Sequence, residues 1–192
     1  MPSDAPATPV WLLDFDGVVN AISKRGGKSI WPEWGSARIP HPNMPGFTLP
    51  ILWSVSVVEL IRHAVDSGVD VRWLTTWREH THTLPAVIDG LPDIPWLDET
   101  ILPAGVADRL DPEQRMASGM WKLEVARAYV PDAAPLLWTD DSYWIMSWSR
   151  EVPEWVSSRT GTTTLVQPQE KHGLVQRQVR DIYAWIAQHT VN

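Results

Sequence analysis

The sequence predicts an α/β fold, in which helices cover both faces of a mostly parallel sheet. Short apolar runs typical of buried strands alternate along the chain with segments of helical periodicity. Polar clusters that begin at Asp14, Thr75 and Asp140 directly follow three of these runs. Because parallel strands present their carboxyl ends at one edge of the sheet, we expect these clusters to lie along a common ligand-binding edge.

The first half of the chain contains two predicted strands and one predicted helix. The apolar runs 10–13 and 69–74 are the strands, and the amphipathic segment 54–67 is the helix. The stretch 20–50 is rich in glycine and proline, so we expect a loop or a β-hairpin there and no helix.

The second half begins with an irregular region at 78–119, in which 99–102 is a candidate short strand. The remaining predicted elements are, in chain order, a helix at 120–129, strands at 135–138 and 162–166, and a closing amphipathic helix at 174–186.

Composition limits the class of protein. The chain has 192 residues, of which 44% are hydrophobic and 20% charged, so it has enough apolar material for one domain and is not disordered in bulk. Cysteine is absent, which excludes disulfides and thiolate chemistry. The net charge of -7 argues against a broad nucleic-acid or anionic-membrane surface, although a local basic groove remains compatible with it.

Domain organisation follows from the same features. We expect a flexible tail at 1–9 and a single domain at 10–192, with an irregular insert at about 20–50. The amino-terminal residues lack the basic and apolar regions of a signal peptide, and no stretch approaches the roughly 18 apolar residues that a membrane span needs. The expected location is therefore the cytoplasm.

The segment Asp14-Phe15-Asp16-Gly17-Val18 is the most specific cluster. Two carboxylates at the exit of a buried strand provide hard oxygen ligands suited to Mg²⁺, and Gly17 allows a sharp turn after them. The segment is not an EF-hand loop, because Gly17 stands too early for the loop glycine and Arg25 occupies the place of the final glutamate. Taken alone, the cluster is also compatible with an ordinary Asp-Gly turn.

The other clusters are less specific one by one. A hydroxyl of Thr75 or Thr76 at a strand end can donate to a phosphate oxygen, although threonine there is often only a turn residue. Lys122 lies near the start of a predicted helix, where most lysines face solvent. Asp140 and Asp141 repel each other, and a cation or solvent must offset the cost.

In this order, the four clusters resemble the motifs of the haloacid dehalogenase (HAD) superfamily. The likeness covers residues 10–142 and implies a Rossmann-like sheet, a small flap or cap at the insert 20–50, and Mg²⁺-dependent phosphoryl transfer. The segments DFDGVVN and TTWR also resemble a small-capped group associated with nucleic-acid-repair phosphatases.

The resemblance implies roles for the acids. Asp14 would attack phosphorus and form an aspartyl-phosphate. Asp16 would protonate the leaving oxygen and then deprotonate the hydrolytic water. The carboxylates of Asp14, Asp140 and Asp141, together with the backbone carbonyl of Asp16, would hold Mg²⁺.

The resemblance also implies a hydroxyl and a cation at the site. Thr75 would hold a phosphoryl oxygen, and Thr76 replaces it if the strand ends one residue later. Lys122 would neutralise charge on the nucleophile and the phosphoryl group, with Lys171 after the fourth strand as the alternative cation.

Three further residues are candidates for substrate binding. In the insert, Lys24 can bind a phosphate and Trp31 can stack a base, whereas packing of Trp31 on the sheet is the alternative. Arg78 would lie near the cleft and hold a second anionic group. Because the inserts are too small for a large capping domain, we expect an open cleft.

The sequence therefore predicts a Mg²⁺-dependent phosphatase that acts on a phosphomonoester. Within the resemblance, Asp16 implies phosphatase or phosphotransferase chemistry, because superfamily dehalogenases lack this second acid and the ATPase pumps have threonine there. A nucleotide or nucleic-acid end phosphatase is the first alternative, and a non-catalytic phosphate-binding module is an alternative of another class. The clustered acids argue against the module, because they are costly without a metal. Neither a membrane nor an obligate protein partner is expected.

Overall fold

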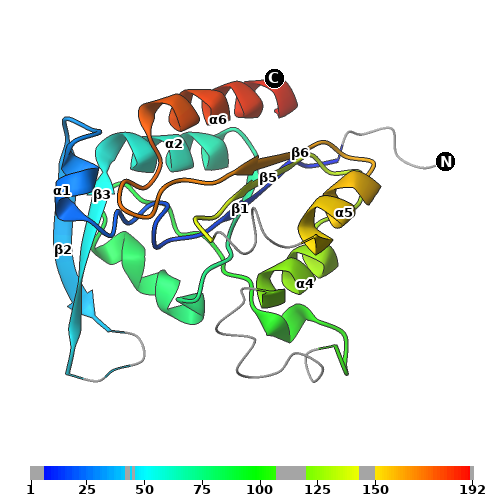
Figure 1. The fold of residues 1–192 in the computed structure, drawn as a ribbon, viewed down its shortest axis with the longest axis horizontal. Helices are drawn as coiled ribbons and strands as arrows, with labels where there is room; N and C mark the ends of the chain where they lie inside the picture. The colour runs from blue at the N-terminus through cyan, green and yellow to red at the C-terminus, as the bar shows by residue number, and fades with distance from the viewer. Residues whose placement is uncertain (1–6, 42–43, 45, 107–119, 143–149, 191–192) are drawn as a thin grey trace.

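The computed structural model of the chain describes residues 7–41, 44, 46–106, 120–142 and 150–190. Its centre is a four-stranded parallel sheet with the strand order β4-β1-β5-β6 (Figure 1). The strands are β1 (Val10–Leu13), β4 (Asp70–Trp73), β5 (Leu136–Thr139) and β6 (Thr163–Val166). The predicted α/β class, with a parallel sheet flanked by helices, is confirmed.

Strand β1 lies in the middle of the sheet and is buried along its whole length, as is β5. A strand covered on both faces favours a continuous apolar sequence, which explains the VWLL and LLWT segments. In the sheet register, Leu13 pairs with Trp73 on one side and with Thr139 on the other. The chain therefore leaves β1, β4 and β5 at the same level, and the residues that follow these strands emerge side by side.

Two helices cover each face of the sheet (Figure 1). The helices α2 (Val55–Asp66) and α6 (Gln176–His189) lie on one face, and α4 (Met120–Tyr129) and α5 (Glu151–Ser158) lie on the other. Each pair buries its apolar side in a separate core cluster. The chain leaves β1 toward the face of α2 and leaves β5 toward the face of α5. Such a reversal creates a crevice outside the carboxyl ends of the two strands.

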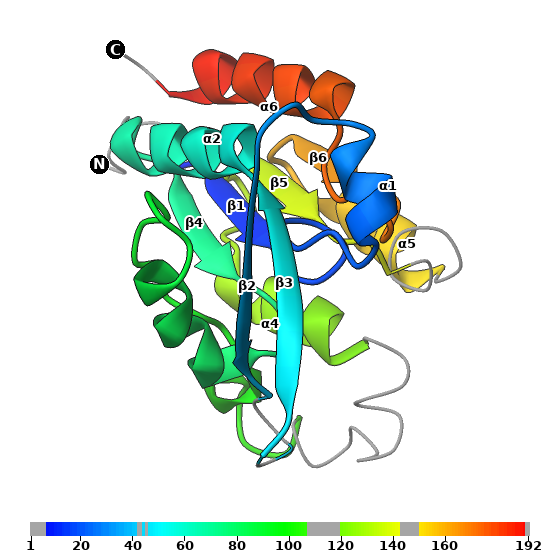
Figure 2. The same cartoon turned by 90° about the vertical axis from the view of Figure 1, so that its left-hand side faces the viewer.

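An antiparallel hairpin of β2 (Trp34–Pro40) and β3 (Thr48–Ser54) stands across the carboxyl ends of the sheet (Figure 2). The hairpin begins within the insert predicted at 20–50 and ends four residues after it, at Ser54. We expected no helix in this insert, and that prediction is wrong: the five-residue helix α1 (Lys24–Lys28) precedes the hairpin. The side chain of Ser23 caps this short helix by accepting a hydrogen bond from the Gly26 N–H.

The segment after β4 contains two 3₁₀ helices, η1 (Arg78–Ala86) and η2 (Glu99–Ile101). The candidate strand at 99–102 is therefore wrong, because the Asp98 carboxylate accepts the Thr100 N–H at 2.9 Å and caps a tight turn instead. Helix α5 has no counterpart among the predicted elements.

Parts of three predicted segments lie outside the described residues, namely 1–6 of the tail, 42, 43 and 45 of the insert, and 107–119 of the irregular region. Within the predicted tail, the Pro9 carbonyl already accepts a hydrogen bond from the Asp70 N–H at 2.9 Å, so contacts with the sheet begin there. None of the helices in the described part of the chain combines the length and apolar character needed to cross a membrane.

Candidate functional site

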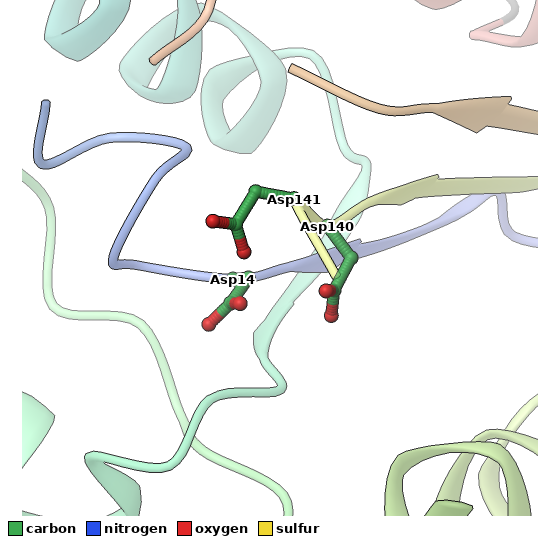
Figure 3. Close-up of side chains that lie close together, drawn as sticks. All are labelled: Asp14, Asp140 and Asp141. Carbon is green, nitrogen blue, oxygen red and sulfur yellow. The ribbon is translucent and has the colours of Figure 1, made fainter. Parts of the chain in front are cut away.

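Three aspartates meet at the carboxyl edge of the sheet. Asp14 directly follows β1, and Asp140 and Asp141 directly follow β5 (Figure 3). One carboxylate oxygen of each lies within 4.8 Å of the others. Asp14 and Asp140 are buried and Asp141 is half-buried. The sheet register brings these acids together, because β1 and β5 are neighbours and end at the same level.

Lys122 lies in the first turn of α4 and connects two of these acids. Its Nζ donates to Asp14 Oδ2 at 2.8 Å and to Asp140 Oδ2 at 2.7 Å. Burial works to lower the pKa of Lys122, but attraction to the two carboxylates outweighs burial and raises the pKa above its usual value. Lys171, the alternative cation, is exposed and lines a hollow beside Asp141. The structure thus brings Lys122 to the acids.

One lysine does not balance three acids. Burial, reinforced by repulsion from Asp14, raises the pKa of Asp140, although Lys122 opposes the shift. Burial also raises the pKa of Asp141 to about 7, and the charges of Asp14 and Asp140 add to the effect. Both shifts show that the ionised cluster is unfavourable by itself. A bound divalent cation would reverse this penalty.

The donor set fits such a cation. Carboxylate oxygens are the hard ligands that Mg²⁺ and Ca²⁺ prefer. Backbone groups fix two of the acids, since the Phe15 N–H donates to Asp14 Oδ1 and the Ser142 N–H donates to Asp140 Oδ1, both at 2.8 Å. These hydrogen bonds and Lys122 hold the carboxylates in place before any ligand arrives.

Gly17 allows Asp141 to approach the turn after β1. Its φ of +70° lies in the left-handed region, and a Cβ atom there would lie 2.0 Å from Asp141 Oδ2. No side chain fits between this turn and the Asp141 carboxylate. The glycine of the DxDG segment is therefore required both by the backbone conformation and by the close packing of the acidic cluster.

Asp16 has partners of its own and does not belong to the three-acid group. Its Oδ1 accepts a hydrogen bond from Asn20 Nδ2 at 2.6 Å, and its Oδ2 accepts one from Trp77 Nε1 at 2.7 Å. Burial raises the pKa of Asp16, although both hydrogen bonds favour its ionised form. The predicted contact between its backbone carbonyl and a metal stays a prediction.

Asn20 and Trp77 are site residues that the sequence analysis did not identify. Asn20 also accepts the Leu52 N–H at 2.9 Å, so it connects Asp16 to β3 of the hairpin. Trp77 packs edge-on against Phe15, with ring centroids 4.9 Å apart. The sequence signal was their place in the segments DFDGVVN and TTWR, to whose Asn20 and Trp77 no role was assigned.

Thr75 and Thr76 differ sharply in exposure. The Leu74 N–H donates to the Leu13 carbonyl at 2.8 Å and extends the pairing of β4 with β1, so Thr75 emerges beside the turn that carries Asp14. Thr75 is 1% exposed, and its Oγ1 accepts the Trp77 N–H at 3.5 Å, whereas Thr76 is exposed. This placement favours Thr75 over Thr76 as the hydroxyl of the site.

Two of the candidate substrate residues have structural partners. Arg78 forms an ion pair with Glu99 at 2.7 Å, and its guanidinium lies 5.3 Å from the centre of the Trp121 ring. Trp31 is 9% exposed and its indole donates to the Leu174 carbonyl at 2.8 Å. The charge of Arg78 is therefore compensated, and burial of the large Trp31 ring stabilises the core. For Trp31 this is the packing alternative given above, and the substrate roles of both residues stay predictions.

Lys24, the third candidate, is exposed at the start of α1 and lines a groove beside the hairpin.

Neither a protein-family model, nor a curated protein, nor a solved structure matches this chain. Function is therefore inferred from the geometry and chemistry of the site.

Proposed function

We propose that the protein is a Mg²⁺-dependent phosphatase of the HAD type, which cleaves phosphomonoesters through an aspartyl-phosphate on Asp14. The observation that carries the proposal is the group of Asp14, Asp140 and Asp141, of which Lys122 bridges the first two, with Asp16 held separately by its own partners. The acids offer a nucleophile and metal ligands, and Asp16 offers an acid–base group.

Asp14 is the proposed nucleophile. Its carboxylate oxygen forms a bond to phosphorus while the bond from phosphorus to the ester oxygen breaks. Lys122, whose Nζ lies 2.8 Å from Asp14 Oδ2, holds this carboxylate in place and attracts the incoming phosphoryl group. Two backbone-anchored oxygens, one on Asp14 and one on Asp140, limit the movement of the acids.

Asp16 is the proposed general acid and base. It gives its proton to the departing ester oxygen, and it then takes a proton from the water that hydrolyses the aspartyl-phosphate on Asp14. Burial raises its pKa and so makes the protonated form more accessible near neutral pH. Asn20 and Trp77 orient its two oxygens through the hydrogen bonds described above.

The remaining groups bind the phosphoryl oxygens and the cation. Asp14, Asp140 and Asp141 would hold Mg²⁺, with the backbone carbonyl of Asp16 as a further ligand. The bound ion would neutralise the charge of the acids and of the phosphate. Thr75 donates its hydroxyl hydrogen to a phosphoryl oxygen. The β2–β3 hairpin takes the position of the small cap in this proposal.

Substitution of the nucleophile tests the proposal. With 4-nitrophenyl phosphate and Mg²⁺, we expect Asp14→Asn to lower kcat by a factor of at least about 1,000, because an amide cannot form the acyl phosphate. Asp66→Asn, which changes an exposed acid at the end of α2, is the matched control and retains activity. Unchanged turnover in Asp14→Asn excludes Asp14 as the nucleophile.

A second measurement separates the enzyme from a non-catalytic phosphate-binding module. A module binds inorganic phosphate in titration calorimetry and turns over no phosphomonoester, whereas the phosphatase forms a phosphorylated protein. We expect rapid-quench mass spectrometry to find the phosphoryl group on the peptide that contains Asp14.

A further inference from the structure

A groove lies between the β2–β3 hairpin and the segment that leads into α1. Its volume is about 370 Å³. One wall is formed by Ala21, Ile22 and Lys24, and the other is the hairpin surface that carries Ser36 and Arg38. In the hairpin register, Ser36 pairs with Leu52 and Arg38 pairs with Pro50, so these side chains share a face. The groove therefore lies along one face of the hairpin.

The charged residues of this groove are both cations. Lys24 and Arg38 line it, and no acid does, although the protein as a whole has a net charge of -7. Within the described ranges, neither cation forms an ion pair with a carboxylate. The Arg38 guanidinium donates two hydrogen bonds to Thr48, from Nε to the hydroxyl at 3.0 Å and from Nη2 to the backbone carbonyl at 3.3 Å. These bonds fix its position. The groove thus offers two uncompensated positive charges to an anion.

Between these cations the groove is apolar. The exposed residue Pro50 and the side chain of Ile22, which is 57% exposed, supply its apolar surface, and the buried residues Ile51 and Leu52 also line it. A ligand that fills the groove would remove this apolar surface from water as well as satisfy the cations. The surface therefore favours a molecule with an apolar body and a negatively charged group over an inorganic anion.

The groove is connected to the proposed general acid by hydrogen bonds. Asn20, which donates to Asp16, accepts the Leu52 N–H at 2.9 Å, and the Ala21 N–H donates to the Leu52 carbonyl at 2.8 Å. Leu52 and Ala21 both line the groove. One residue, Asn20, thus separates the groove wall from Asp16.

A second hollow joins the same segment to the acidic cluster. The Ile22 N–H donates to the Glu170 carbonyl at 3.0 Å. Glu170 and Lys171 line a hollow of about 500 Å³ that also contains Asp141. Residue 22 therefore lies on the groove and, through Glu170, at the border of the hollow beside the acids. A substrate with its reacting phosphate at Asp14 can extend in this direction.

We infer that the groove binds the leaving group of the substrate, and that this leaving group combines an apolar ring with a second phosphate held by Lys24 and Arg38. The inference rests on the proposed phosphatase function and adds a substrate class to it. Either a small bisphosphate or the phosphorylated end of an oligonucleotide presents this chemistry.

The first experiment compares kcat/KM for adenosine 3′,5′-bisphosphate with kcat/KM for 4-nitrophenyl phosphate. We expect Arg38→Ala and Lys24→Ala each to lower this ratio about fivefold to twentyfold, mainly through a higher KM for the bisphosphate. Arg38→Glu lowers the ratio further, and Arg38→Lys restores part of it. Arg25→Ala and Lys28→Ala remove the same charge from exposed positions of α1 outside the groove, and they leave the ratio unchanged.

Equal ratios in Arg38→Ala, Arg25→Ala and the unsubstituted protein overturn the inference while leaving the phosphatase intact. A 5′-phosphorylated dinucleotide, assayed in parallel, identifies the source of the second phosphate: the arm with the higher kcat/KM is the preferred substrate type.

If the unsubstituted protein hydrolyses neither phosphomonoester, the proposed function fails and the groove is tested by binding alone. Titration calorimetry with adenosine 3′,5′-bisphosphate then supports the groove if Arg38→Ala weakens binding and Arg25→Ala does not. Absence of binding overturns the inference.

Discussion

The two ends of the parallel sheet differ in the balance of acidic and basic side chains. At the amino end, Asp70 accepts from Arg72 Nε at 2.7 Å and from the Tyr129 hydroxyl at 2.6 Å, and Arg72 lies 5.3 Å from the centre of the Tyr129 ring. One acid there meets one cation and one neutral donor. At the carboxyl end, a group of three acids meets one lysine.

The difference separates a charge-balanced cluster from one that a bound cation would stabilise. The amino-end group is partly exposed and balanced, so it needs no ligand. The carboxyl-end group is more buried and carries excess negative charge. Burial first, and repulsion between the acids second, raise the pKa of both Asp140 and Asp141. The unfavourable electrostatic energy of these carboxylates is located at the edge where a ligand can offset it, as expected of a binding or catalytic site.

The largest effect is expected from removing the cation at the carboxyl end. Lys122→Met leaves Asp14 and Asp140 buried without their shared partner, so we expect a loss of about 3 kcal/mol in the free energy of unfolding without metal. Urea denaturation measures it. The matched variant Arg72→Met breaks a partly exposed pair at the other end and costs about 1 kcal/mol or less. Equal losses in the two variants contradict the contrast between the two ends.

Addition of Mg²⁺ sharpens the same contrast. A cation bound only by the folded protein stabilises it by about 2.7 kcal/mol at one hundred times its dissociation constant. We expect Mg²⁺ to raise Tm in differential scanning calorimetry and EDTA to reverse the change. Asp70→Asn retains the response, because Asp70 lies at the opposite end. A Tm indifferent to Mg²⁺ removes the metal from the proposed mechanism.

Asp141→Asn has a smaller effect, and its sign depends on pH. Because the pKa of Asp141 is raised to about 7 in the folded protein, the folded state binds this proton more tightly than the unfolded state. Without metal, stability therefore falls as pH rises from about 4 through 7. We expect Asp141→Asn to raise Tm at pH 8 by about 2–4 °C for each kcal/mol of repulsion removed. The gain should shrink at pH 5, and a lower Tm at pH 8 contradicts the assignment.

The smallest effect is expected at the amino end. Tyr129→Phe removes the hydroxyl that donates to Asp70, and we expect a loss of about 1 kcal/mol in the free energy of unfolding. Activity toward 4-nitrophenyl phosphate stays unchanged, because this hydrogen bond does not contact the acidic cluster. A fall in kcat with unchanged stability would show that the two ends are coupled.

The sequence predicted those parts of the fold that depend on neighbouring residues. The VWLL and LLWT runs identify buried strands, and the periodicity of 54–67 and 174–186 identifies α2 and α6. The turn at 98–102 and helix α5 were not predicted, since local hydrogen bonds and packing decide such short elements.

Candidate site residues divide in the same way. Acids that directly follow apolar strands are recognisable in the sequence, because parallel strands deliver them to one edge. The contact of Lys122 with Asp14 spans 108 positions, and that of Trp77 with Asp16 spans 61. No local pattern reports such pairs. The same limit applies to the ion pair of Arg78 with Glu99 and to the packing of Trp31 in the core, because both contacts join residues that are distant in the sequence.

The sequence by itself determined the α/β class, the strands of the parallel sheet and the acids at the strand ends, because these follow from the spacing of apolar and polar residues along the chain. Only the tertiary structure decided that Lys122 bridges two acids, that Asn20 and Trp77 hold Asp16, and that Lys24 and Arg38 share a groove. These contacts join distant segments, and they exist only where the sheet register and the hairpin bring those segments to the same edge.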